Sequence, residues 1–359
     1  MEKVRLLDLG SVSPLRSQTM YHAAGYALTE NSPNTIILIN SNSPYVCIGF
    51  HQDLDKEVDV EYCREHDLSI YRREVGGGAV FLDDNQVFTQ WIFQPGVLPA
   101  SLDERFELYI KSLVDTYQAY GVNAYHRPVN DIHVDGKKIG GTGAAQIGRA
   151  EVVVGSLMFD FNKATMARVL KASSEKMRDK IFESLEQYMT TMRELLDEEP
   201  DRQKVKETYM EMVSKSLGVE VVPGSWTDEE EEICAELDAR FASDEWVNQV
   251  GGLRKSGVKI HEDVRVVEAA FKAPGGLIRV TARLNKNIID DLAISGDFTL
   301  FPSKSVASLE ESVRGLAASG EVLTEGFQKV YQALNLQSPG VTANDFSSAV
   351  LAAATAAQP

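Results

Sequence analysis

The sequence predicts an α+β protein with a large domain of mixed and antiparallel sheets flanked by helices, followed by a small α+β domain. Short β-prone runs alternate with amphipathic helical segments through the first 245 residues, which favours sheets covered by helices. The composition then shifts at Gly251-Gly252, where three β-prone runs precede two helical segments. We therefore expect a large domain over residues 1–245, a small domain over 250–345, and a tail over 346–359 that frays because it lacks a clear apolar face.

The overall charge restricts the classes of partner. The chain has 359 residues and a net charge of −17, which disfavours nucleic acid or an anionic membrane as a partner. Its three cysteines are widely spaced and form neither a disulfide framework nor a zinc pattern, which is typical of a reducing cytosol. The N-terminus lacks a signal-peptide pattern, and no apolar run is long enough to span a bilayer. We expect a cytoplasmic protein.

Turn residues and apolar spacing define the elements of the large domain. Helices are expected over residues 17–30, 57–66 and 102–120, and strands over 36–39, 45–48, 79–81, 87–93 and 152–161. Cys47 falls in an apolar strand and Cys63 in a helix, so both are interpreted as packed core thiols. A stripe at helical spacing predicts that the third helix packs on a sheet: Phe106, Tyr109, Ile110, Leu113 and Tyr117.

Largely helical segments follow residue 161. Apolar side chains between Met177 and Leu196 fall near one face, and the methionines among them are interpreted as gap-filling core. Thr227 and Glu230 fit a capping box at the start of a further helix. In the small domain, strands are expected over 264–271, 277–284 and 292–295, and helices over 309–316 and 326–336.

The stretch from Arg72 to Phe88 carries the first candidate site. Its sequence, RREVGGGAVFLDDNQVF, holds the only adjacent arginines and the only triple glycine of the chain. Unhindered N–H groups in such a loop form a concavity for phosphate or carboxylate oxygens, and guanidinium groups bind the same anions in a bidentate fork. Glycine-rich turns are also common without a ligand, so this stretch alone is a weak signal.

The stretch from Asn130 to Gly143, NDIHVDGKKIGGTG, adds a second cationic, glycine-rich segment. Its Asp135-Gly136 pair predicts a two-residue hairpin. In that register the opposed pairs are His133 with Lys138 and Ile132 with Ile139. One face is then mainly apolar, and the other is polar and carries Asp131, His133 and Lys138. A lysine on a rigid strand beside a glycine turn suits charge that develops on a phosphate; an ordinary surface hairpin with solvated lysines is the alternative.

With these motifs identified, the chain resembles the lipoate–protein ligase family, which is related to the biotin–protein ligases. The matching motifs occur in the family's order over most of the chain: SPYVCIGFHQD, RREVGGGAVFLDDN, NDIHVDGKKIGGTGAAQ, VGSLMFDFN and, towards the C-terminus, SGDFTLF. The resemblance implies a biotin/lipoate ligase-like fold with an accessory C-terminal domain. It also implies that lipoate or octanoate is activated with ATP and Mg2+ to acyl-AMP, with release of pyrophosphate.

The resemblance further implies an acceptor protein and the roles of single residues. The acyl group passes to one lysine of a dehydrogenase lipoyl domain, a glycine-cleavage H protein or a related sulfur-metabolism carrier. Lys138 matches the family's essential lysine, and Asn130 resembles its asparagine near the adenylate. The other residues expected around the acyl-adenylate are Arg73, Gly76, Gly77, Gly78, Ala79, Val80, Phe81, Asp131, Gly141, Thr142 and Gly143. No metal ligands are assigned.

Two alternatives remain open. Some relatives are octanoyltransferases that act from octanoyl carrier protein and carry the acyl group on a cysteine just before this hairpin. Residues 124–128 here read AYHRP, without a thiol, which favours the ATP route; Cys47 or Cys63 would otherwise have to serve. The second alternative is a module that binds a lipoylated partner without chemistry, because Val75, Leu82 and Val154 replace polar residues of the family pattern.

Overall fold

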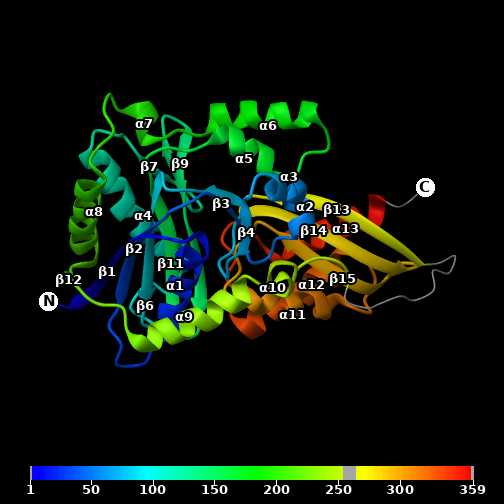
Figure 1. The fold of residues 1–359 in the computed structure, drawn as a ribbon. Coiled ribbons are helices and arrows are strands. Elements are labelled where there is room, and N and C mark those ends of the chain that lie inside the picture. The colour runs from blue at the N-terminus through cyan, green and yellow to red at the C-terminus, as the bar shows by residue number, and fades with distance from the viewer. Residues whose placement is uncertain (1, 254–263, 357–359) are drawn as a thin grey trace. The chain divides into compact units, whose positions relative to one another are not determined.

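The computed structural model describes residues 2–253 and 264–356 and forms two compact units (Figure 1). The first unit comprises Met1–Cys47, Val58–Arg73 and Val80–Val247. The second comprises Ile48–Glu57, Glu74–Ala79 and Asn248–Pro359. Two short segments from the first hundred residues therefore belong to the second unit, which a single boundary near residue 250 does not anticipate.

The first unit is built on a six-stranded mixed sheet. Its strand order is β10-β11-β6-β2-β1-β12, with β1 (Lys3–Val12), β2 (Thr35–Ser41), β6 (Gln86–Phe93), β10 (Gly143–Ile147), β11 (Ala150–Met158) and β12 (Glu220–Pro223). The β1 strand pairs in parallel with β2 and β12, and the other pairs are antiparallel. All eight residues of β6 are buried, so this strand lies at the centre of the core.

Helices cover both faces of this sheet (Figure 1). The helices of the unit are α1 (Pro14–Tyr26), α3 (Val60–Glu65), α4 (Leu102–Ala119), α5 (Lys163–Val169), α6 (Glu175–Tyr188), α7 (Met192–Leu195), α8 (Arg202–Leu217), α9 (Asp228–Phe241) and α10 (Asp244–Val247). Gln90 of β6 donates to the Ser17 carbonyl of α1, and its neighbour Trp91 donates to the Tyr209 hydroxyl of α8. Successive residues of one strand thus reach opposite layers, as strand geometry requires.

Several predicted helical features are confirmed. The predicted stripe of α4 is buried along its whole length. Thr227 and Glu230 form the capping box at the start of α9. The helix expected over 57–66 is instead two pieces, α2 (Leu54–Glu57) and α3. The break follows from Val58, which bridges to Leu170, and from Asp59, which caps α3 by accepting from the Tyr62 N–H.

The interpretation of the methionines as gap-filling core is confirmed for Met192, which is fully buried in α7, but it is wrong for Met177 in α6. Met177 is 44% exposed, Phe182 is also exposed, and Arg178 is the only buried residue of this helix. The Arg178 guanidinium donates to the Ala167 and Arg168 carbonyls and pairs with Asp59 at 2.9 Å. A buried arginine, rather than a hydrophobic stripe, therefore anchors α6.

Two small sheets complete the first unit. One has the order β4-β3-β5 and the other β7-β8-β9, with β3 (Tyr45–Ile48), β4 (Ser69–Arg72), β5 (Val80–Leu82), β7 (Tyr125–Arg127), β8 (Asp131–Val134) and β9 (Lys137–Gly141). The two candidate stretches thus lie on, or next to, these small sheets. Among the described residues, no helix combines the length and the hydropathy that crossing a membrane requires.

The second unit is a three-stranded antiparallel sheet covered by helices. Its elements are α2, β13 (Val264–Ala273), β14 (Gly276–Asn285), β15 (Ile288–Gly296), a short 3-10 turn (Ser303–Ser305), α11 (Val306–Val313), α12 (Gly320–Leu334) and α13 (Ala343–Ala356). The expectation that the chain frays after residue 346 is wrong for α13. Phe346, Ala349, Val350 and Ala353 of this helix are fully buried, because small alanines let it lie close to β13. Residues 357–359 lie outside the described residues.

Candidate active site

The hairpin that carries Lys138 forms as predicted, with one difference in register. Asp135 and Gly136 have φ values of 49° and 82°, as the turn favoured in two-residue hairpins requires. His133 lies opposite Lys138, but Ile132 lies opposite Gly140 rather than Ile139. The extra residue forms a bulge, so the predicted Ile132–Ile139 pairing is wrong. Ile132, Val134 and Ile139 are nevertheless all buried, as expected.

The ammonium group of Lys138 lies against a carboxylate and a glycine. Its Nζ is 2.7 Å from Oδ1 of Asp131, and the Lys138 side chain is 29% exposed. A Cβ atom on Gly141 would lie 3.0 Å from the same Nζ. The missing side chain of Gly141 therefore provides the space in which Asp131 holds the cation, and the group stays accessible from solvent.

Asn130 and Thr142 lock the open end of the hairpin. The Thr142 N–H donates to the Asn130 carbonyl at 2.9 Å, and the Thr142 hydroxyl donates to the same oxygen at 3.1 Å. The Asn130 side-chain amide donates to the Thr142 carbonyl. Gly143 then begins β10, opposite Val154 of β11. The structure thus groups six of the predicted site residues at one place in the first unit: Asn130, Asp131, Lys138, Gly141, Thr142 and Gly143.

His133 shares the polar face of the hairpin with Asp131 and Lys138, as predicted, but its side chain is fully buried. The Tyr188 ring packs edge-on against it at 5.6 Å, and the Tyr125 ring lies 6.2 Å away. Tyr188 reaches the hairpin because Met189 bridges to Lys138 and the Thr190 N–H donates to the Lys138 carbonyl. The sequence carries no signal for this contact, since Tyr188 lies some fifty residues further along the chain.

The adjacent arginines have different roles. Arg72 is buried and donates to the Val247 carbonyl at 2.6 Å, while the Trp246 indole donates back to the Arg72 carbonyl at 2.9 Å. The expectation that both arginines face an anionic ligand is therefore wrong for Arg72, which fixes α10. The next residue, Arg73, donates instead to the Cys47 carbonyl at 3.3 Å.

The triple glycine is packed against backbone within the second unit. A Cβ atom on Gly76 would lie 2.9 Å from the Phe298 carbonyl oxygen, and one on Gly49 would lie 1.9 Å from the Gly77 carbonyl oxygen. Gly77 also has a φ of 92°, a backbone conformation that residues with a side chain rarely adopt. Packing thus explains why glycine stands here. The pocket that this loop and the hairpin were expected to share stays a prediction, because Gly76 to Ala79 belong to the second unit, whereas Val80 and Phe81 lie in β5 of the first.

All three cysteines are buried, as predicted for Cys47 and Cys63. Burial raises the pKa of Cys63 and of Cys234 to about 11, and it also raises the pKa of Cys47. A thiol becomes a nucleophile only as its thiolate. At neutral pH these groups remain protonated and shielded from solvent.

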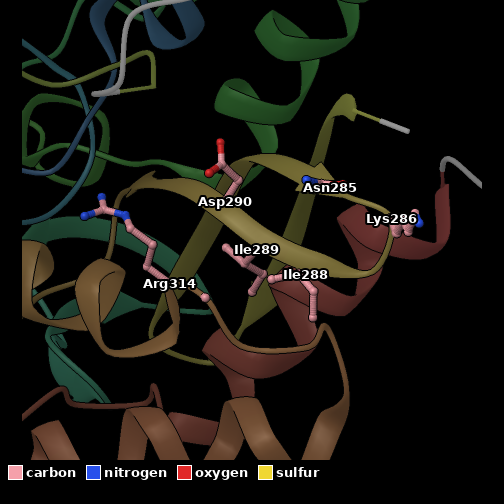
Figure 2. Close-up of a pocket in the computed structure, with 7 residues that line it drawn as sticks. Asn285, Lys286, Ile288, Ile289, Asp290 and Arg314 are labelled. Carbon is pink, nitrogen blue, oxygen red and sulfur yellow. The ribbon is translucent and has the colours of Figure 1, made fainter. Parts of the chain in front are cut away.

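A surface pocket of about 380 Å³ occurs in the second unit, at the β14–β15 turn (Figure 2). Asn285, Lys286, Asp290 and Arg314 line it with the apolar side chains of Ile288 and Ile289. Arg314 pairs there with Asp291 at 3.0 Å and with Glu311. None of the predicted site residues lines this pocket. Within residues 2–253 and 264–356, no three His, Cys, Asp or Glu side chains are grouped as a metal site.

The fold gives the structural class of the protein, and comparison with known proteins gives its family. The sheets and flanking helices are those of the lipoate ligase fold. Residues 17–214 match the family model described as the lipoyl protein ligase A/B catalytic domain. The match covers more than half of the chain, so the chain belongs to this family of lipoate ligases and octanoyltransferases.

The similar proteins include relatives named as octanoyltransferases and relatives named as lipoate ligases. Octanoyltransferase LipM of Kyrpidia tusciae is 27% identical over 273 residues, which cover 68% of this chain and 98% of that protein. Lipoate–protein ligase 2 of Staphylococcus aureus is 26% identical over 291 residues, which cover 78% and 81%. The solved structure of a bipartite lipoate protein ligase from Thermoplasma acidophilum, studied with its E2 lipoyl domain, superposes with a TM-score of 0.64 at 22% identity and covers 70% of this chain and 99% of that one. The family resemblance drawn from the motifs is thereby confirmed.

Proposed function

We propose that this chain is an ATP-dependent lipoate–protein ligase. It activates lipoate or octanoate to acyl-AMP with release of pyrophosphate, and it then passes the acyl group to a lysine of an acceptor protein. The state of the thiols carries the proposal. A thioester route needs an accessible thiolate, whereas all three cysteines of this chain are buried and have a raised pKa. The adenylate route requires no protein nucleophile.

The hairpin supplies what the adenylate route needs. The carboxylate of the acid is already ionised and attacks the α-phosphate of MgATP without a general base. The protein therefore has to hold two anions together and neutralise the charge that builds on phosphorus. Lys138 is the cation for this charge, Asp131 orients it from 2.7 Å, and Asn130 and Thr142 keep the hairpin rigid. In this proposal Arg73, the loop from Gly76 to Ala79, Val80 and Phe81 form the wall around the acyl group and the adenylate.

The acceptor in this proposal is a lipoyl domain or an H-protein-like carrier. The Thermoplasma acidophilum ligase with a similar fold was studied with its E2 lipoyl domain, which supports a partner of this class. The acceptor lysine, in its neutral form, attacks the mixed anhydride, and Lys138 then holds the phosphate oxygens of the leaving AMP. In this proposal the reaction takes place in the cytoplasm.

A cysteine-free variant tests the proposal directly. Cys47, Cys63 and Cys234 are replaced by alanine, and the variant is incubated with a lipoyl domain, lipoate and ATP. We expect the mass of the acceptor to rise by one lipoyl group, only when ATP is present, in both the variant and the unmodified protein. An acceptor whose mass never changes, with any donor, would instead indicate a protein that binds its partner without chemistry.

An octanoyltransferase is the second candidate, favoured by the match to LipM over 98% of that protein's length. Cys47 is its best nucleophile, because the Arg73 guanidinium lies 3.6 Å from Sγ and would stabilise a thiolate. This candidate predicts transfer from octanoyl carrier protein without ATP, and loss of that transfer in the cysteine-free variant. Assays of the unmodified protein and of its cysteine-free variant therefore distinguish the two activities.

A further inference from the structure

The hydrogen bonds of His133 define a neutral ring. Nδ1 lies 3.2 Å from the Gly136 carbonyl oxygen, which only accepts, so Nδ1 carries the hydrogen. Nε2 lies 3.4 Å from Nη1 of Arg127, which only donates, so Nε2 presents its lone pair. A protonated ring would put an N–H against the arginine. These two hydrogen bonds favour the uncharged tautomer that carries its hydrogen on Nδ1.

His133 is one member of a chain of contacts that ends at Lys138. The Tyr188 hydroxyl accepts from Arg127 Nη1 at 3.1 Å. Asp131 turns Oδ2 towards His133 Nε2, at 3.8 Å, and Oδ1 towards Lys138 Nζ, at 2.7 Å. The charged and titratable groups around the ring come from every neighbouring element: Tyr125 and Arg127 of β7, Asp131 of β8, Lys138 of β9 and Tyr188 of α6.

We propose that His133 is a positioning residue, which stays neutral so that Asp131 serves Lys138 alone. This inference rests on the proposed function, in which Lys138 neutralises the phosphate charge. A protonated His133 would be a second cation beside Asp131 and would draw its carboxylate away from the ammonium. It would also repel Arg127 and loosen the contact with Tyr188 that holds the hairpin.

The surroundings of the ring keep the neutral form populated at physiological pH. Burial is the largest cause that lowers the pKa of His133 below 6.5, and the charges of Arg127 and Lys138 act in the same direction. The Gly136 carbonyl and Asp131 act in the opposite direction. The ring therefore protonates only at a lower pH than an ordinary histidine. The rate at which the carboxylic acid substrate is activated is expected to fall only at that lower pH.

Substitution of His133 by glutamine tests this role. Glutamine keeps a polar group near the position of Nε2 but does not titrate. Pyrophosphate release from lipoate and ATP, without acceptor, is measured from about pH 5 to 8. The H133Q rate is expected within about threefold of the unmodified rate at the upper end, where the ring is neutral anyway. The ratio of variant to unmodified rate should then rise as the pH falls, by up to about tenfold per pH unit. Both proteins share any titration of the substrates, so a constant ratio overturns the inference.

A second variant keeps the test decisive if H133Q does not fold. Removal of the Arg127 charge by R127Q eliminates a cause that lowers the pKa of His133, so the fall in rate should move to higher pH. An unmoved profile overturns the inference. Nitrogen chemical shifts of the His133 ring give a readout that needs no activity: a neutral Nδ1–H ring at pH 7 supports the inference and a charged ring overturns it. No ATP-dependent pyrophosphate release at any pH would count against the proposed function, and the ring shifts would still decide the state of His133.

Discussion

The two glycine-bearing stretches use glycine for different purposes. In the loop from Glu74 to Ala79, the space beside Gly76 is filled by backbone, because its Cβ would lie 2.9 Å from the Phe298 carbonyl oxygen and 3.1 Å from the Thr299 Cα. In the hairpin, the space beside Gly141 is filled by the ammonium of Lys138, at 3.0 Å. One glycine permits chain packing, and the other gives room to a functional side chain.

This difference shows that a glycine cluster is a poor guide to a ligand until the neighbour of each missing side chain is known. Close packing of backbone on backbone leaves a loop rigid, and a substitution there is felt as lost stability. A glycine beside a flexible charged group permits a position of that group, and a substitution there is felt as lost activity. The two stretches should therefore respond to mutation in opposite ways.

The largest expected effect is on Lys138. We expect K138A to reduce pyrophosphate release from lipoate and ATP by about 100- to 1000-fold, as loss of one donor to a developing charge typically does. Thermal unfolding should stay unchanged, because the side chain is partly exposed. The neighbouring Lys137 is the matched control, since its Nζ contacts the Glu186 carbonyl at 3.4 Å. K137A should release pyrophosphate at a rate within about threefold of the unmodified protein, and an equal loss in both variants would remove Lys138 from its role.

Substitution of Gly76 by alanine should act on stability instead. The new methyl group would meet backbone atoms of residues 298–299, which cannot move aside by changing a rotamer. Such overpacking typically lowers the free energy of unfolding by about 1–3 kcal/mol. Denaturant unfolding of the purified protein measures this free energy. Gly78 is the matched control, because its nearest neighbour would be 3.7 Å away, at ordinary contact distance. A loss for G78A as large as that for G76A would contradict the packing explanation.

Local sequence patterns predicted the structural features that depend on residues close together in the chain. The Asp135-Gly136 turn, the His133–Lys138 pair and the buried stripe of α4 follow from spacing alone. Contacts between distant segments were not predictable in this way. The backbone that packs on Gly76 comes from Phe298, more than two hundred residues further on, and the ring over His133 comes from Tyr188.

Arg72 and α6 show a second limit of the sequence pattern. Arg72 and Arg73 are adjacent in the sequence, but only the contact with Val247 decides that Arg72 is the buried one. Likewise, the apolar spacing of α6 is real, yet Arg178 anchors the helix through backbone carbonyls, and Met177 stays exposed. In both cases, a buried arginine finds carbonyl acceptors that no periodicity encodes.

The smallest effect, and the sharpest test of the comparison, is expected at Gly141. An added methyl group would meet Lys138 Nζ at 3.0 Å and Cε at 3.2 Å, and the flexible end of the lysine can move aside. The fold should therefore tolerate G141A, while the ammonium shifts from its place beside Asp131. We expect pyrophosphate release to fall about tenfold, which corresponds to about 1.4 kcal/mol of transition-state stabilisation, with little change in unfolding. Gly140 is the matched control, because its nearest neighbour, Ile132 Cδ1, would be 3.5 Å away. If G141A lowered stability but not the rate, glycine in the hairpin would serve packing, and the two stretches would not differ.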